Sequence, residues 1–167
     1  MKHSEHIVLA IDPGYDRLGV AVLREENNKT TLLFSDCIVT DRKNKHEVRL
    51  GIVGQTISNL IKEWSPHSLA IEELFFSNNQ KTALLVSQAL GVIIYEATRS
   101  TVDVFYYKPV EIKVAVTGYG RSDKTHVIDM VSRLIHMNKK PKLDDEYDAI
   151  AVGLTHLACR HSKIVRT

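Results

Sequence analysis

The sequence predicts a single α/β domain over its 167 residues, built on a five-stranded mixed sheet with helices on both faces. Three observations lead to this fold class. Residues 1–40 contain three apolar segments joined by short connections, which indicates that the first three strands form an antiparallel meander. Further along the chain, helical spacing alternates with two shorter strand-like segments. No repeat, linker or low-complexity segment divides the chain, so we expect one core of ordinary size.

The expected strands are runs rich in Ile, Val and Leu. The run at 7–11 has no polar alternation, which is typical of a strand buried on both faces. Segments 18–23 and 30–39 are predicted as the second and third strands, and 68–74 and 102–106 as the fourth and fifth. A meander followed by parallel additions places the first strand at the centre of the sheet, with the fourth strand as its neighbour.

Helices are predicted from the 3.6-residue spacing of apolar side chains. The expected ranges are 46–64, 78–100, 109–116, 123–137 and 144–160. The second of these helices carries apolar residues on nearly every face, so one side can pack on the sheet while the other needs a second layer or a partner subunit. This pattern favours a homodimer.

The composition is that of a globular protein, with 44% hydrophobic and 25% charged residues, which excludes the disordered and fibrous classes. No apolar run approaches the roughly 20 residues that span a bilayer, and no signal-peptide pattern is present. We therefore expect a cytoplasmic protein. Cys37 and Cys159 have no nearby cysteine partner, so neither a disulfide framework nor a zinc site is expected.

The formal net charge of +2 hides an uneven distribution along the chain. Residues 99–142 carry a net charge of +5, whereas the segments before and after carry −2 and −1. A basic segment beside acidic clusters suits a protein that holds a polyanion and cations together. We expect the basic segment to face nucleic acid.

Four carboxylates stand where this fold could gather them. Asp12 ends the first strand, and Glu72 lies toward the end of its expected neighbour. Asp145 and Asp148 are three residues apart, so on a helix they project from one face. Hard cations such as Mg²⁺ require oxygen ligands, and two such ions ~4 Å apart stabilise an in-line phosphoryl displacement. The arrangement therefore predicts a metal-dependent site.

Each carboxylate also has a purely structural interpretation. Asp12 fits the first position of an Asp-x-Gly turn, and the acidic run 144–146 fits the cap of a helix. Glu72 or Glu73 could be an exposed strand end. The combination of all four positions, rather than any single one, favours the metal site.

Four stretches, in order along most of the chain, resemble the RuvC family of Holliday-junction resolvases. The first is Ile-Asp-Pro-Gly at 11–14 with Gly19, and the second is Ala-Ile-Glu-Glu-Leu-Phe at 70–75 with Asn79 and Gln-Ala-Leu-Gly-Val at 88–92. The third comprises Lys108-Pro109, Lys113, Gly-Tyr-Gly at 118–120 and Asp123-Lys124. The fourth is Asp-Glu-Tyr-Asp-Ala-Ile-Ala at 145–151, which continues to Thr155-His156. Within these motifs the chain departs from the family pattern at Leu90, Ser122 and His126.

The resemblance implies an RNase H-like fold and a homodimer that nicks two opposed strands of a four-way DNA junction. It assigns two Mg²⁺ ions, which Mn²⁺ can replace, to four ligands: Asp12, Glu72, Asp145 and Asp148. The positions within the motifs select Glu72 over Glu73 and Asp145 over Asp144. It also implies a branch-migration motor as a working partner.

The resemblance further implies residues that contact DNA. It marks Lys113 and Lys124 as basic residues near the scissile phosphate, where a lysine can offset developing charge. An aromatic residue matching Phe75 meets DNA near the junction point in this family, and stacking on a base tolerates any sequence. The remaining expected DNA contacts are Lys108, Tyr119 and Arg121.

Three other functions remain compatible with parts of this pattern. Another RNase H-like nuclease would use the same carboxylates on RNA or on non-branched DNA. The Asp12 to Gly19 segment also fits the phosphate turn of actin-like ATPases and sugar kinases, but 167 residues leave no room for their second lobe. A junction-binding module without catalysis is disfavoured by the four intact carboxylates.

Overall fold

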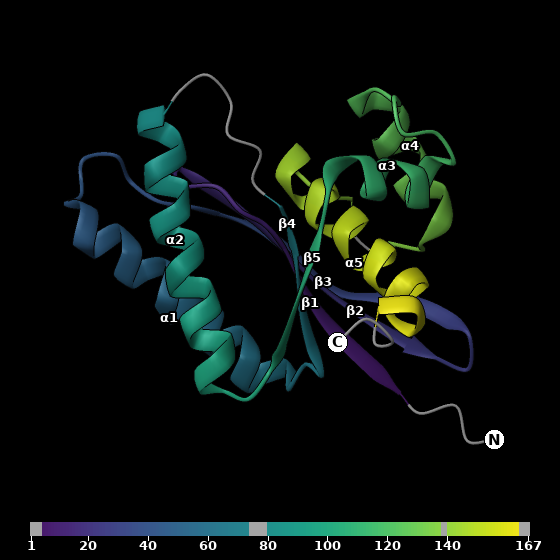
Figure 1. The fold of residues 1–167 in the computed structure, drawn as a ribbon, viewed down its shortest axis with the longest axis horizontal. Coiled ribbons are helices and arrows are strands. Elements are labelled where there is room, and N and C mark those ends of the chain that lie inside the picture. The colour runs from purple at the N-terminus through teal and green to yellow at the C-terminus, as the bar shows by residue number, and fades with distance from the viewer. Residues whose placement is uncertain (1–4, 74–79, 138–139, 164–167) are drawn as a thin grey trace.

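The computed structural model describes residues 5–73, 80–137 and 140–163 (Figure 1). In these ranges the elements follow the order β1 (His6–Asp12), β2 (Arg17–Glu26), β3 (Lys29–Val39), α1 (His46–Trp64), β4 (Ser68–Glu72), α2 (Gln80–Arg99), β5 (Asp103–Tyr107), α3 (Pro109–Thr117), α4 (Lys124–Leu134) and α5 (Asp144–Lys163). The predicted order of strands and helices is confirmed. Among the described residues, no helix is both long and apolar enough to cross a membrane.

The five strands form one sheet in the order β3-β2-β1-β4-β5, with β1 at its centre. The pairs β1–β2 and β2–β3 are antiparallel, whereas β1–β4 and β4–β5 are parallel. Ile11 of β1 lies beside Ile71 of β4, so Asp12 and Glu72, the last residues of their strands, lie on the same edge of the sheet. The predicted mixed sheet with an antiparallel meander is therefore confirmed.

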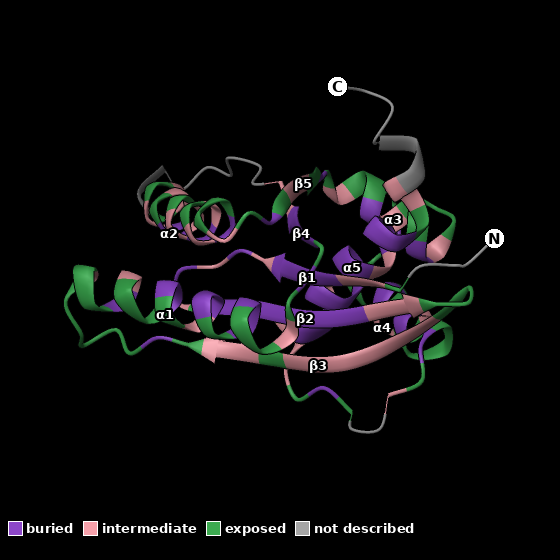
Figure 2. Cartoon of the chain, turned by 90° about the horizontal axis from the view of Figure 1, so that it is seen from below, coloured by how far each residue is buried: buried purple, intermediate pink, exposed green. Residues whose placement is uncertain are grey.

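Helices cover both faces of this sheet, as predicted. α1 and α2 lie on one face, and α3, α4 and α5 lie on the other (Figure 1). α5 packs closely across β1 and β2: a Cβ at Gly153 would come within 2.4 Å of Leu23 Cδ1 and 3.2 Å of Ala10 Cβ, so a larger residue there would have to displace the Leu23 side chain. Figure 2 shows burial concentrated in β1 and β2, whereas the edge strand β3 is only half-buried.

α2 uses its apolar residues differently from what its composition suggests. Ala89, Ile93 and Ala97 are buried at helical spacing, which gives the helix one buried stripe. Leu84 and Tyr95 on the same helix are 62% and 63% exposed. A single chain therefore covers only one side of α2, and the homodimer inferred from the second side stays a prediction.

Two elements end two or more residues earlier than the sequence predicts. β4 ends at Glu72, and residue 74 of the predicted strand lies outside the described residues. α4 ends at Leu134 instead of 137, because Ile135 takes an extended backbone with φ −132° and ψ 133°. In that conformation the Ile135 side chain lies in the core, where it is 2% exposed.

A buried arginine ties the turn after β1 to α1. Arg49 is 6% exposed, and its guanidinium lies 3.7 Å from the centroid of the Tyr15 ring. It donates hydrogen bonds to the Tyr15 carbonyl oxygen and to Thr40 Oγ1, and it forms an ion pair with Asp16. A buried charge is stable only when it is paired and hydrogen-bonded. Arg49 therefore fixes the path of the turn that leads from Asp12 into β2.

Replacing Arg49 with alanine should lower the free energy of unfolding by about 2–4 kcal/mol, because its hydrogen bonds and its packing on Tyr15 are lost together. Arg42→Ala is the matched control, since Arg42 pairs with the same Asp16 through a side chain that is 79% exposed. We expect that control to change stability by less than about 0.5 kcal/mol. Urea denaturation followed by circular dichroism measures both changes. Equal losses in the two variants would contradict a special role for the buried guanidinium.

Candidate active site

The structure brings the four predicted carboxylates to one edge of the sheet. Asp12 and Glu72 end the neighbouring parallel strands β1 and β4, and Asp145 and Asp148 lie in the first turns of α5. Each of the other three carboxylates raises the pKa of Asp12 by charge repulsion, so all three lie within electrostatic reach of Asp12.

Gly19 allows the start of α5 to approach β2 this closely. A Cβ at Gly19 would fall 2.1 Å from the carbonyl oxygen of Asp145 and 3.2 Å from the Cβ of Asp12. Gly19 is also the residue paired with Asp12 across β1 and β2. Gly19 of the first sequence motif is therefore the residue that lets Asp145 of the helix lie next to Asp12 of the strand.

Burial and mutual repulsion raise the pKa values of these carboxyl groups. Burial, followed by repulsion from Glu72, Asp148 and Asp145, raises the pKa of Asp12 to about 8. The pKa of Glu72 rises to about 7, first through burial and then through Asp148. Burial also raises the pKa of Asp148. Negative charge is therefore in excess in a poorly solvated place, and a cation bound there would relieve that repulsion.

Both lysines predicted near the scissile phosphate lie by these carboxylates. Lys124 Nζ is 2.7 Å from Asp144 Oδ2 and 3.0 Å from Asp148 Oδ2. Burial alone would lower the pKa of Lys124, but the hydrogen bonds to Asp144 and Asp148 have the larger combined effect. The pKa of Lys124 is therefore raised above its ordinary value. In return, the hydrogen bond from Lys124 lowers the pKa of Asp144 to about 2. The positive charge of Lys113 acts to lower the pKa of Glu72, so this second lysine lies within electrostatic reach of Glu72.

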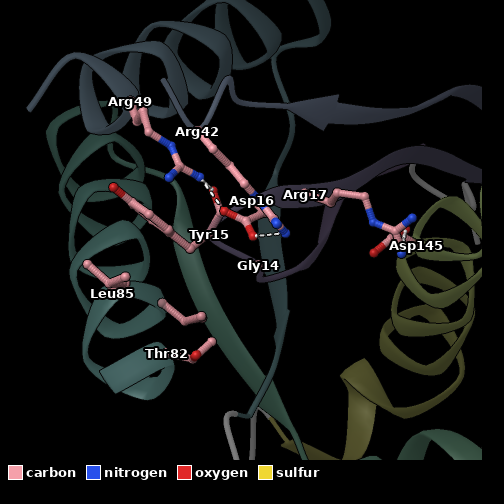
Figure 3. A pocket seen from close by; sticks show the side chains of 10 residues that line it. Gly14, Tyr15, Asp16, Arg17, Arg42, Arg49, Thr82, Leu85 and Asp145 are labelled. Carbon is pink, nitrogen blue, oxygen red and sulfur yellow. Dashed lines mark hydrogen bonds and ion pairs between the residues drawn. The ribbon is translucent and has the colours of Figure 1, made fainter. Parts of the chain in front are cut away.

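Arg17 is a site residue that the sequence interpretation missed. Its Nη2 atom is 3.0 Å from Asp145 Oδ2 and 3.4 Å from Asp144 Oδ1, and Figure 3 shows the side chain reaching toward Asp145. The available signal was position, because Arg17 begins β2 directly after the turn that follows Asp12. Arg17 faces the start of α5 because α5 packs on β2, and the sequence alone does not show that contact.

The chemistry of the four carboxylates fits a hard divalent cation, since all the donors are oxygen atoms and positive charge is favoured there. Asp145 Oδ2 is buried and accepts no hydrogen bond within the described part of the chain. However, no group of three or more His, Cys, Asp or Glu side chains in that part is arranged to hold a metal ion. Asp145 and Asp148 are instead engaged by Arg17 and Lys124. The metal role of the carboxylates stays a prediction.

The predicted DNA contacts lie on the helix pair α3–α4 and its loop. Lys108, Tyr119 and Arg121 are exposed, with Tyr119 58% exposed. Ser122, one of the departures from the family pattern, is buried and donates a 2.8 Å hydrogen bond to the Tyr119 carbonyl oxygen, which stabilises the loop. Phe75 lies outside the described residues. Contact of these residues with DNA stays a prediction.

A cleft of about 710 Å³ opens beside Asp145 between the turn after β1 and the first turns of α2. In Figure 3, Arg42 and Arg49 meet at Asp16 on one wall, and Arg17 points along the cleft to Asp145. These arginines lie outside the segment that the charge distribution marks as basic. Charge counting along the chain therefore missed a second cluster of cations near the carboxylates.

Comparison with known sequences identifies relatives over nearly the whole chain. A family model described as crossover junction endodeoxyribonuclease RuvC matches residues 8–156. The crossover junction endodeoxyribonuclease RuvC of Finegoldia magna is 43% identical over 150 residues, which cover 90% of this chain and 92% of the relative. The protein of the same name from Alkaliphilus oremlandii is 40% identical over the same shares of both chains.

Solved structures agree with the sequence comparison. Thermus thermophilus RuvC in complex with a Holliday junction substrate superposes with a TM-score of 0.88 at 29% identity, over 94% of this chain and 96% of that one. The yeast mitochondrial Holliday junction resolvase superposes with a TM-score of 0.69 at 12% identity, over 95% of this chain and 80% of that one. The second likeness supports the RNase H-like resolvase fold alone.

Without divalent cations, the free energy of unfolding should fall as the pH rises from about 4 to about 8. The folded-state pKa values of Asp12 and Glu72, about 8 and about 7, lie above their ordinary values of 3.8 and 4.5. The folded protein therefore retains protons that the unfolded chain releases, and this stabilising contribution is lost as each group ionises in the folded state.

Urea denaturation in a chelator across this pH range measures the fall, which should reach on the order of a few kcal/mol. Asp12→Asn removes the ionisable group with little change of shape, so the difference between variant and wild type isolates the contribution of Asp12. A difference that does not change with pH would contradict the raised pKa.

Proposed function

The chain belongs to the RuvC family of crossover junction endodeoxyribonucleases, which makes it a Holliday-junction resolvase, and from this premise we propose how its site works. Asp12, Glu72, Asp145 and Asp148 would hold two Mg²⁺ ions, or Mn²⁺ in their place. The observation that carries this proposal is the gathering of these four carboxylates on one sheet edge, where burial and repulsion favour positive charge. When bound, such ions stabilise the attacking and leaving oxygens of phosphodiester hydrolysis.

The other groups of the site act on the substrate and on the carboxylates. Lys124 lies between Asp144 and Asp148 with 52% of its side chain exposed, so its ammonium can reach a phosphate and offset the charge that develops there. Lys113 supplies a second positive charge near Glu72. Because Asp12 and Glu72 have pKa values near neutrality, loading the site with cations at neutral pH requires both carboxyl groups to release their protons.

The basic segment would hold the DNA backbone through the exposed face of α3, α4 and their loop. Lys108 and Arg121, which are exposed, would contact phosphates, and the exposed Tyr119 would stack on a base or contact the backbone. Phe75 would meet DNA near the junction point, as the family resemblance implies.

A homodimer would carry two such sites related by a two-fold axis, one for each of two opposed strands. The exposed apolar residues on the outer side of α1 and α2 support this assembly, because a monomer leaves them in water. They are Val48, Ile52, Leu84 and Tyr95. The resemblance also implies that a branch-migration motor works with the dimer.

Glu72→Gln should keep the affinity for a four-way junction within about twofold of wild type and lower the cleavage rate by at least about 10³-fold. The substitution removes a charged metal ligand but leaves the fold unchanged. Glu73→Gln is the matched control, since Glu73 is the next residue and its backbone N–H bonds to the Tyr107 carbonyl oxygen. The control should cleave like wild type. Gel-shift binding in Ca²⁺ and single-turnover cleavage in Mg²⁺ measure the two effects. Equal cleavage by the two variants, or loss of binding together with cleavage in Glu72→Gln, would contradict the assignment.

A further inference from the structure

Arg17 forms an ion pair with Asp145, which is one of the four proposed metal ligands. Its Nη2 atom lies 3.0 Å from Asp145 Oδ2. That oxygen is buried and accepts no hydrogen bond in the described residues, so the nearby guanidinium charge is what compensates it. Arg17 also lies 3.4 Å from Asp144 Oδ1, which keeps the guanidinium beside the start of α5.

The backbone of Arg17 is held rigidly, whereas its side chain can move. A Cβ at Gly14 would come within 1.8 Å of the Arg17 carbonyl oxygen, so the turn is closed tightly over this residue. Arg17 is also paired with Val39 across β2 and β3. Its side chain, in contrast, is 45% exposed and lines the open cleft beside Asp145. The guanidinium can therefore rotate into the cleft without leaving a buried position.

Lys124 and Arg17 both pair with Asp144, but among the four proposed metal ligands each contacts a different carboxylate. Lys124 pairs with Asp148 and influences the pKa values of Asp12 and Glu72. Within the described ranges, Arg17 is the residue that forms an ion pair with Asp145. A divalent cation that uses Asp145 must share this carboxylate with a positive charge 3.0 Å away or displace it.

We propose that Arg17 competes with the divalent cation for Asp145 and thereby sets the affinity of the site for metal. This inference rests on the proposed function, because it takes Asp145 as a metal ligand. The guanidinium neutralises a half-buried carboxylate that would otherwise repel its neighbours, and it turns into the cleft when a cation binds. Arg17 is thus a residue that tunes cation binding, rather than one that touches the reacting phosphate.

Isothermal titration calorimetry of the full chain with Mn²⁺ alone tests the competition, since it needs neither DNA nor turnover. Arg17→Gln keeps a polar side chain of similar length but removes the charge, and it should bind Mn²⁺ about three- to tenfold more tightly than wild type, the range expected for a partly exposed ion pair. Arg17→Lys keeps the charge and should stay closer to wild type.

Arg42→Gln is the matched control, because Arg42 lines the same cleft and its loss changes the net charge equally, but it pairs with Asp16. This control should leave Mn²⁺ affinity within about twofold of wild type. Thermal unfolding of each variant verifies that it is folded before titration. An equal gain in both variants would overturn the specific role of Arg17 in favour of a general charge effect.

Asp12→Asn separates failure of this inference from failure of the proposed function. In the first outcome, wild type binds Mn²⁺, Asp12→Asn does not, and Arg17→Gln binds Mn²⁺ no more tightly than wild type. The metal site then stands and the role of Arg17 is overturned. If neither wild type nor Arg17→Gln binds Mn²⁺, the inference and the proposed metal site are both overturned. Binding by Arg17→Gln that exceeds wild type and is lost in the double variant with Asp12→Asn supports both.

Discussion

At Gly19 the backbone of β2 lies against the first turn of α5, where a single methyl group would come within 2.1 Å of the Asp145 carbonyl oxygen. The site depends on this contact, because it brings a carboxylate from the end of the chain beside Asp12 at the end of the first strand. Gly153 permits the same close packing farther along α5, against Leu23 and Ala10. The sheet supplies the second constraint, since parallel pairing of β1 and β4 sets Glu72 on the same edge as Asp12.

Gathering these acidic groups has an energetic cost that the protein offsets locally. Repulsion and burial raise the pKa values of Asp12 and Glu72 toward neutrality, so the site holds protons that it must release to bind cations. Lys124 and Arg17 neutralise part of the remaining charge, with Asp144 bonded to both. Without a cation, burial and repulsion at this site still lower the stability of the protein, which is a common compromise between stability and function.

Sequence reasoning predicted the elements, the strand directions and the four carboxylates, because strand-end position and helical spacing determine which way such residues project. It missed what depends on side chains meeting across the fold. Arg17 is far from Asp145 along the chain, and only the packing of α5 on β2 brings them together. The apolar pattern of α2 predicted burial on two sides, but one chain buries one side. The sequence marks His156 only as part of the last motif, yet its side chain is fully buried and hydrogen-bonded to Ser68 and Tyr107.

Metal-dependent cleavage of branched DNA by this site is tested most directly by comparing three substrates of matched sequence. They are a synthetic four-way junction, a linear duplex and an RNA–DNA hybrid, each incubated with the wild-type protein in Mg²⁺ or in a chelator. Paired, symmetric nicks in the junction alone, lost in the chelator, are the result that we predict. Cleavage of the hybrid or the linear duplex with the junction left intact would contradict the claim, and would assign the same fold and carboxylates to a different nucleic-acid substrate.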